Sequence, residues 1–165
     1  MAADVNAQLL EWLDQAYNRR SWHGTNLRGS LRGLSAGDAA WRPGPGRHNI
    51  WELTVHCAYW KYAVWRRVTG ARRGSFPLEG SNWFERPAER HDDRTDRAWQ
   101  ADIALLNRMH RLLREAAAEC STRDLERRPK GSTFTNRALI SGSAAHDLYH
   151  AGQIQVLKRL RPART

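Results

Sequence analysis

Apolar residues recur at intervals of three and four along four long stretches of this chain, which is the spacing of one face of an α-helix. The stretches cover roughly residues 5–33, 49–70, 93–120 and 137–160. No segment shows the alternation of apolar and polar residues that is typical of a half-buried strand. The pattern therefore predicts an all-α protein, and 165 residues is the length of a single domain, here residues 1–165.

The ends of the predicted helices carry local signals. Asn49 followed by Glu52 is an N-cap with a carboxylate that returns to the backbone, and Gly70 ends the same helix. Serine and aspartate three residues apart predict two short capped turns, at residues 35–38 and 121–124.

Two segments interrupt the helical pattern. Gly24, Gly29 and Gly33 predict a kink or a break in the second half of the first stretch. Residues 71–92 are rich in proline, glycine and charged residues, which predicts a long crossover loop between the second and third long helices. Four long helices with one long crossover predict a four-helix bundle.

The chain is strongly basic, with a formal net charge of +10. The charge is spread evenly, because residues 1–82 and 83–165 each carry +5 and neither half has a basic arm. Three of the eight tryptophans, Trp12, Trp51 and Trp99, fall on predicted core faces, which leaves fewer to stack on bases. We therefore expect a solvated, arginine-rich surface and do not expect nucleic acid as the partner.

The sequence also predicts where the protein resides. Its longest run without a charged residue is ten residues, 148–157, which is shorter than the ~20 residues of a membrane span. The first 15 residues contain acids where a signal peptide has a basic region. Two cysteines make neither a disulfide framework nor a thiolate metal cage. We expect a cytoplasmic protein with no membrane partner.

Two histidines in the last predicted helix are the first candidates for functional residues. His146 and His150 are four residues apart, so their imidazoles lie on one helical face. The same face carries Leu139, Ile154 and Leu157, and therefore points into the core. Buried imidazoles need hydrogen-bond partners or a metal ion, because burying an unpaired polar group is costly. A pair of this kind also arises by chance in helices, so a third ligand is needed to decide.

The second long helix supplies that third histidine. His56 lies among apolar residues in the middle of the helix. Taken alone, it is more often a core histidine with satisfied hydrogen bonds. Taken with His146 and His150, it predicts a three-histidine metal site, since neutral imidazole nitrogens are common ligands of transition metals.

A zinc-protease motif is the competing interpretation of the same pair. The segment 146–150 resembles H-E-x-x-H, with Asp147 at the position of the general base. Such sites usually take a third ligand downstream, but residues 151–165 contain no His, Asp or Glu. We therefore favour a third ligand from upstream and give the protease interpretation little weight.

The remaining histidines and the nearby cysteine carry less information. His23, close to the expected break in the first helix, is a candidate for lining a cavity or supporting a ligand. His48, His91 and His110 are interpreted as surface or structural residues. Cys57 adjoins the histidine at position 56 but projects about 100° away around the helix, so it is not counted as a ligand.

Three segments resemble the DinB-like (DNA-damage-inducible) metal-binding four-helix-bundle family. They are WHGTNL at residues 22–27, HNIWELTVHCAYW at residues 48–60 and HDLYHAGQI at residues 146–154. The resemblance covers nearly the whole chain, and its last segment is the most specific. The members of this family are unrelated to the error-prone DNA polymerase that shares its name.

This resemblance implies both a fold and a site. It implies an up-down-down-up bundle, often a homodimer, that binds zinc or nickel. His56, His146 and His150 occupy the family's three ligand positions. Characterised members of the family include transferases that use low-molecular-weight thiols such as bacillithiol or mycothiol.

Three functions remain open at this point. The preferred one is a metalloenzyme with a thiol-dependent S-transferase activity on a small-molecule substrate, in which the metal lowers the pKa of a bound thiol or water. Arginines near the mouth of the site would hold an anionic substrate or thiol, although the sequence does not place them. The alternatives are a metal-dependent hydrolase and a non-catalytic stress-response binding protein.

Three more residues are candidates for supporting the ligands. Glu52 lies one turn before His56 and is placed to hydrogen-bond its imidazole, although its role at the helix cap competes. Asp147 and Gln153 flank the histidine pair of the last helix and are candidates for lining the cavity or orienting a ligand.

Overall fold

The computed structural model describes residues 5–86 and 93–162, and all regular structure in those ranges is helical. The prediction of an all-α protein is therefore confirmed. The helices, in chain order, are α1 (Val5–Tyr17), α2 (Leu27–Ser30), α3 (Ala36–Ala40), α4 (Ile50–Thr69), α5 (Asp93–Ala118), α6 (Thr122–Glu126) and α7 (Asn136–Leu160).

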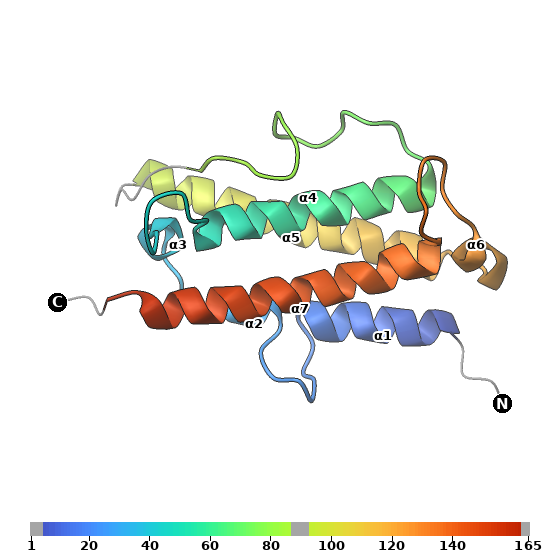
Figure 1. Cartoon of the computed structure of the whole chain (residues 1–165), viewed down its shortest axis with the longest axis horizontal. Helices are drawn as coiled ribbons and strands as arrows, with labels where there is room; N and C mark the ends of the chain where they lie inside the picture. Colours follow the sequence, from blue (N-terminus) through green and yellow to red (C-terminus); the bar gives the residue numbers. More distant parts are fainter. Residues whose placement is uncertain (1–4, 87–92, 163–165) are drawn as a thin grey trace.

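The four long helices α1, α4, α5 and α7 lie side by side, as Figure 1 shows. Helix α4 packs against α5 and α7, and α1 packs against the other sides of the same two helices. The short helices α2 and α3 add contacts to α7 and α4, while α6 packs against α7. No helix in the described ranges is long and apolar enough to cross a membrane.

Helix α4 begins and ends where local chemistry predicts. The side chain of Asn49 accepts a hydrogen bond from the backbone N–H of Glu52 at 2.8 Å. Gly70 follows the helix with a φ of 75°, a left-handed conformation that glycine adopts without strain. The two short helices α3 and α6 begin with capping boxes at Ser35 and Ser121. The positions of all three predicted starts are confirmed, but the Glu52 carboxylate does not return to the backbone as predicted and binds Arg42 and His48 instead.

The predicted interruption of the first helix is a complete break. Helix α1 ends at Tyr17, and Gly24 lies further on in a turn with a φ of 96°. The side chain of Asn26 then donates to the carbonyl of Arg19 at 2.7 Å and accepts from the N–H of Gly29 at 2.8 Å. Asn26 thereby ties the loop to the start of α2 and caps it.

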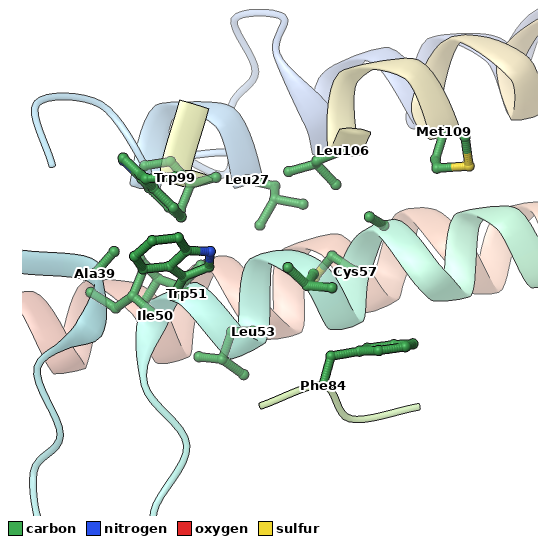
Figure 2. Close-up of a cluster of buried hydrophobic side chains, with 14 of the residues drawn as sticks. Leu27, Ala39, Ile50, Trp51, Leu53, Cys57, Phe84, Trp99, Leu106 and Met109 are labelled. Carbon is green, nitrogen blue, oxygen red and sulfur yellow. The ribbon is translucent and has the colours of Figure 1, made fainter. Parts of the chain in front are cut away.

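The core between α4 and α5 is built around two indoles (Figure 2). Trp51 and Trp99 meet edge to face with centroids 5.3 Å apart, which confirms their predicted burial. Their N–H groups are satisfied by the Asp102 carboxylate at 2.6 Å and the Leu34 carbonyl at 3.1 Å. The prediction for Trp12 is wrong: it is 54% exposed, because α1 turns this face away from α5 and α7.

His110 is structural and not a surface residue. It is buried and stacks on the ring of Tyr17 at a centroid distance of 3.7 Å. Its Nδ1 has no hydrogen-bond partner among the described residues. Burial, helped by the positive charges of Lys61 and Arg114, lowers the pKa of His110 to about 2. The folded protein therefore holds this imidazole neutral in ordinary buffers.

Replacing His110 with phenylalanine should remove part of the acid sensitivity of the fold. The unfolded histidine binds a proton below its ordinary pKa of about 6.5, whereas the folded one does not, so stability falls as the pH falls below that value. Between pH 7.5 and pH 5, metal-free wild-type protein should lose about 2 kcal/mol more of its unfolding free energy than His110→Phe. Urea denaturation at both pH values measures the difference, and equal losses would contradict the assignment.

Candidate metal centre

Helices α4 and α7 bring three histidines to one point. His56 comes from α4, while His146 and His150 lie one turn apart on α7. The Nε2 atom of His146 lies 3.1 Å from the Nε2 atom of His56 and 3.1 Å from the Nε2 atom of His150. All three residues offer a ligand atom within 4.8 Å of the others. The convergence that the sequence predicts is thus present in the folded chain.

Two of the three imidazoles, those of His56 and His150, make a hydrogen bond through Nδ1, and these bonds determine that Nε2 faces the point where the three rings meet. The Nδ1–H of His56 donates to the backbone carbonyl of Asn82 at 2.8 Å. The Nδ1–H of His150 donates to the Oε1 atom of Gln153 at 2.7 Å. A neutral imidazole that carries its proton on Nδ1 presents a lone pair on Nε2. Both rings therefore present an Nε2 lone pair to this point, as a metal ligand would, and Gln153 makes the hydrogen bond that a supporting residue would make.

The donor set fits a transition metal ion. Neutral imidazoles with converging lone pairs repel one another unless a proton or a cation lies between them. Nitrogens bound at about 2.1 Å to one ion are about 3.0–3.4 Å apart at coordination angles between right and tetrahedral. The two Nε2 separations of 3.1 Å agree with that spacing. Imidazole nitrogen suits zinc and nickel equally, so the donor set does not choose between them.

Burial keeps these histidines in the form that binds a metal. It lowers the pKa of His56 to about 4, although the hydrogen bond to Asn82 acts in the opposite direction. It lowers the pKa of His146 to about 3, with the two neighbouring histidines adding to the effect. Burial also lowers the pKa of His150. At neutral pH all three rings are uncharged without help from a metal.

The loop between α4 and α5 contributes two residues that sequence reasoning missed. Asn82 has a φ of 67° and accepts the His56 hydrogen bond on its carbonyl and one from Trp60 Nε1, at 2.8 Å, on its side chain. Trp83 lies between the rings of His56 and His48, with centroids 3.9 Å and 3.6 Å away. The available signal is an asparagine in a glycine- and serine-rich loop, because asparagine tolerates left-handed backbone.

A cavity of about 1150 Å³ opens beside the three histidines. Its walls come from α4, from α7, from the segment between α3 and α4, and from the loop that carries Trp83. No carboxylate lines it among the residues that the structure describes. Besides the three histidines, the wall residues most relevant to a ligand are Arg47, His48, Leu53, Trp60, Trp83, Tyr149, Val156 and Leu157. The site therefore offers an aromatic and aliphatic surface to an apolar molecule.

Behind the histidines, an ion pair joins the same two helices. Lys61 of α4 donates to the Asp147 carboxylate of α7 at 2.5 Å, and both side chains are only 1% exposed. Burial raises the pKa of Asp147 to about 6, against the opposing effect of the lysine charge. The second Asp147 oxygen has no partner among the described residues. Asp147 faces this lysine and does not line the cavity, so nothing supports a protease-like base.

The expectation that Glu52 hydrogen-bonds His56 is wrong. Its carboxylate instead accepts hydrogen bonds from the guanidinium of Arg42 and from Nδ1 of His48 at 2.9 Å. Burial acts to raise the pKa of Glu52, but these hydrogen bonds, the charge of Arg42 and a hydrogen bond with Asn49 together outweigh it, and the pKa is lowered. A charged guanidinium binds a carboxylate more strongly than a neutral imidazole does, which explains the choice of partner.

The other residues weighed in the sequence analysis do not add to the three-histidine cluster where the structure describes them. His23 is exposed and does not line the cavity. His91 lies outside the described residues. Cys57 is buried, burial raises the pKa of its thiol, and it forms a second possible donor group with His146 and Asp147. The lysine ammonium already neutralises that aspartate, so the three imidazoles are the better donor set.

Comparison with known protein families identifies a relationship. The model of the DinB superfamily matches residues 7–154, which include the three histidines and the loop asparagine that supports one of them. Searches for similar curated proteins and for similar solved structures found none.

Variants of Asn82 should separate the role of its backbone from that of its side chain. Asn82→Gly keeps the carbonyl and tolerates the positive φ, whereas Asn82→Ala is strained there. Zinc affinity should fall in both, by about tenfold or more in the alanine variant and by less in the glycine variant. Competition with a chromophoric chelator measures this. The exposed neighbour Ser81→Ala should bind zinc as the wild type does, and equal affinities across the set would contradict the role of Asn82.

The Lys61–Asp147 ion pair should be strongly coupled. Lys61→Met or Asp147→Leu alone should destabilise the protein by about 3–5 kcal/mol, because each leaves a buried charge without a partner. The double variant should lose much less than the sum of the two. Urea denaturation of all four proteins completes the cycle, and additive losses would show that the pair is not coupled.

Proposed function

This chain belongs to the DinB superfamily, and from its site we propose that it is a metal-dependent enzyme whose divalent ion, zinc or nickel, is held by His56, His146 and His150. The observation that carries the proposal is the convergence of three Nε2 atoms, two of them on rings whose Nδ1 protons are already bound. Three protein ligands leave room for a substrate, as in catalytic sites, whereas structural sites are closed by a fourth.

A metal ion held there supplies a Lewis acid and lowers the pKa of a bound thiol or water. The chain's own residues bind and orient the substrate. Trp83 stacks on His56 and Trp60 meets the same ring edge to face, so one wall of the cavity is rigid and excludes water beside the ligand. Tyr149 and Val156 are exposed apolar residues on the opposite, α7 side. These walls favour a small molecule with an apolar or aromatic body.

Within this proposal, thiol-dependent S-transfer is better supported than hydrolysis. No carboxylate among the described residues lines the cavity, and Asp147 is paired with Lys61 behind it. A bound metal lowers the pKa of either nucleophile, so the difference lies in the leaving group: a hydrolase needs a side chain that protonates it, and no carboxylate that the structure describes is placed to do so. A thiol, whose ordinary pKa of about 8.5 already lies far below that of water, needs only the metal to become a nucleophile at neutral pH. The thiol class implied by the family resemblance, bacillithiol or mycothiol, accordingly remains the proposed co-substrate.

The family assignment carries further proposals. We infer the up-down-down-up topology, which Figure 1 supports because α1 and α7 run towards one end of the bundle and α4 and α5 towards the other. A homodimer and a role in a stress response are proposals of the same kind, and a cytoplasmic location is a proposal that rests on the sequence analysis. A non-catalytic binding protein with a bound metal is the competing function.

Elemental analysis of protein purified without a histidine tag should find about one divalent metal per chain. His146→Ala and His150→Ala should each lose the metal and keep their helical circular dichroism, since the core around α4 and α5 does not depend on these rings. The exposed His23→Ala is the matched control and should retain metal. Metal-free wild-type protein after supplementation would overturn the proposal.

A panel of low-molecular-weight thiols with electrophilic acceptors, assayed with zinc, nickel and manganese, tests the catalytic part. We expect turnover that requires thiol and metal together and that both histidine variants abolish. Tight metal binding with no turnover for any pair would favour the non-catalytic alternative.

A further inference from the structure

A second cavity, of about 540 Å³, lies against the first. Trp60 and His146 line both cavities and form the wall between them. The other walls of the second cavity come from α4, from α7 and from the turn at residues 131–134. The function proposed above uses only the first cavity, so the role of the second is open.

Each of the two cavities is lined by one glycine of α7. Gly142 lines the second cavity and Gly152 lines the first. Each lies inside a helix, where glycine is less favourable than alanine by about 1 kcal/mol. Neither has a positive φ, and a Cβ built on either one meets no atom within 4 Å. Backbone conformation and close helix packing therefore do not require glycine at these positions, and a larger side chain at either one would extend into the cavity that the glycine lines.

The second cavity also contains a cation that lacks a counter-ion. Arg67 is half-buried, and its guanidinium donates to the backbone carbonyl of Ala63 at 3.3 Å. It forms no ion pair with a carboxylate among the described residues. Burial and the neighbouring charges of Arg66 and Arg73 lower the pKa of Arg67, which is the expected effect of cations crowded without an anion. The C-terminal dipole of α4 compensates only part of this charge.

We propose that the second cavity binds a small organic carboxylate, with its charged group on Arg67 and its apolar body against Trp60 and His146. A single guanidinium and largely apolar walls match one carboxylate better than a phosphate, which carries nearly two charges. The inference deepens the proposed function, on which its catalytic meaning rests: it adds an anionic ligand, held on the far side of Trp60 and His146 from the first cavity.

Calorimetric titration with 4-phenylbutyrate, and with 4-phenylbutanol as its uncharged counterpart, tests the site. The carboxylate should bind wild-type protein, and Arg67→Gln should weaken it by about tenfold or more while leaving the alcohol nearly unchanged. Arg72→Gln deletes an exposed charge just beyond the same end of α4. It is the control for general electrostatics and should have little effect.

Filling each cavity in turn locates the ligand. Gly142→Leu should abolish binding of the carboxylate, whereas Gly152→Leu, which makes the same change on the same helix, should leave it intact. Both variants should fold, because leucine is the better helix former. Failure of 4-phenylbutyrate to bind, or equal loss in both glycine variants, would overturn the inference. The titrations are run with and without zinc, so that binding of the carboxylate is measured independently of the metal centre. If the three histidines bind no metal, the elemental analysis shows it, and these titrations are unaffected.

Discussion

The buried ion pair between Lys61 and Asp147 is the contact on which the geometry of the site depends. Removing two charges from water is costly, and an isolated pair of this kind rarely adds stability to a core. It does specify a register, because any sliding of α7 along α4 separates the charges. His146 directly precedes this aspartate, and His56 lies five residues before the lysine. The contact that fixes the two helices therefore also fixes the distance between their histidines.

Two helices alone do not complete the site. They supply the three nitrogens, but the proton on His56 is directed by the carbonyl of Asn82, which belongs to the loop after α4. The same asparagine holds Trp60, and Trp83 next to it covers the His56 ring. One loop thus sets the tautomer of a ligand and closes one wall of the cavity. The connection has to return along α4 in any case, because α4 and α5 start at the same end of the bundle (Figure 1), and its described part, up to Arg86, also builds the site.

What could be predicted from the sequence was local. The cap at Asn49 depends on neighbours in the chain, and the face shared by His146 and His150 depends only on helical spacing. The errors concern partners distant in sequence. Trp12 has the spacing of a core residue, yet which face of α1 is covered depends on where α5 and α7 lie. Glu52 binds Arg42, ten residues away in the sequence. The group that accepts the His56 proton is the backbone carbonyl of Asn82, and because every residue carries such a carbonyl, the sequence does not single it out.

Several departures from local preference gather around His146. The charges of Lys61 and Asp147 are buried behind it, Asn82 adopts a left-handed backbone in front of it, and Gly142 weakens the helix four residues before it. Each lowers stability, and none is needed to pack a helical bundle, since the core around Trp51 obeys the ordinary rules. Departures of this kind that gather around one residue, and that packing does not require, are expected at a functional site. His146 and Trp60 lie at the centre of this group, with a cavity on each side.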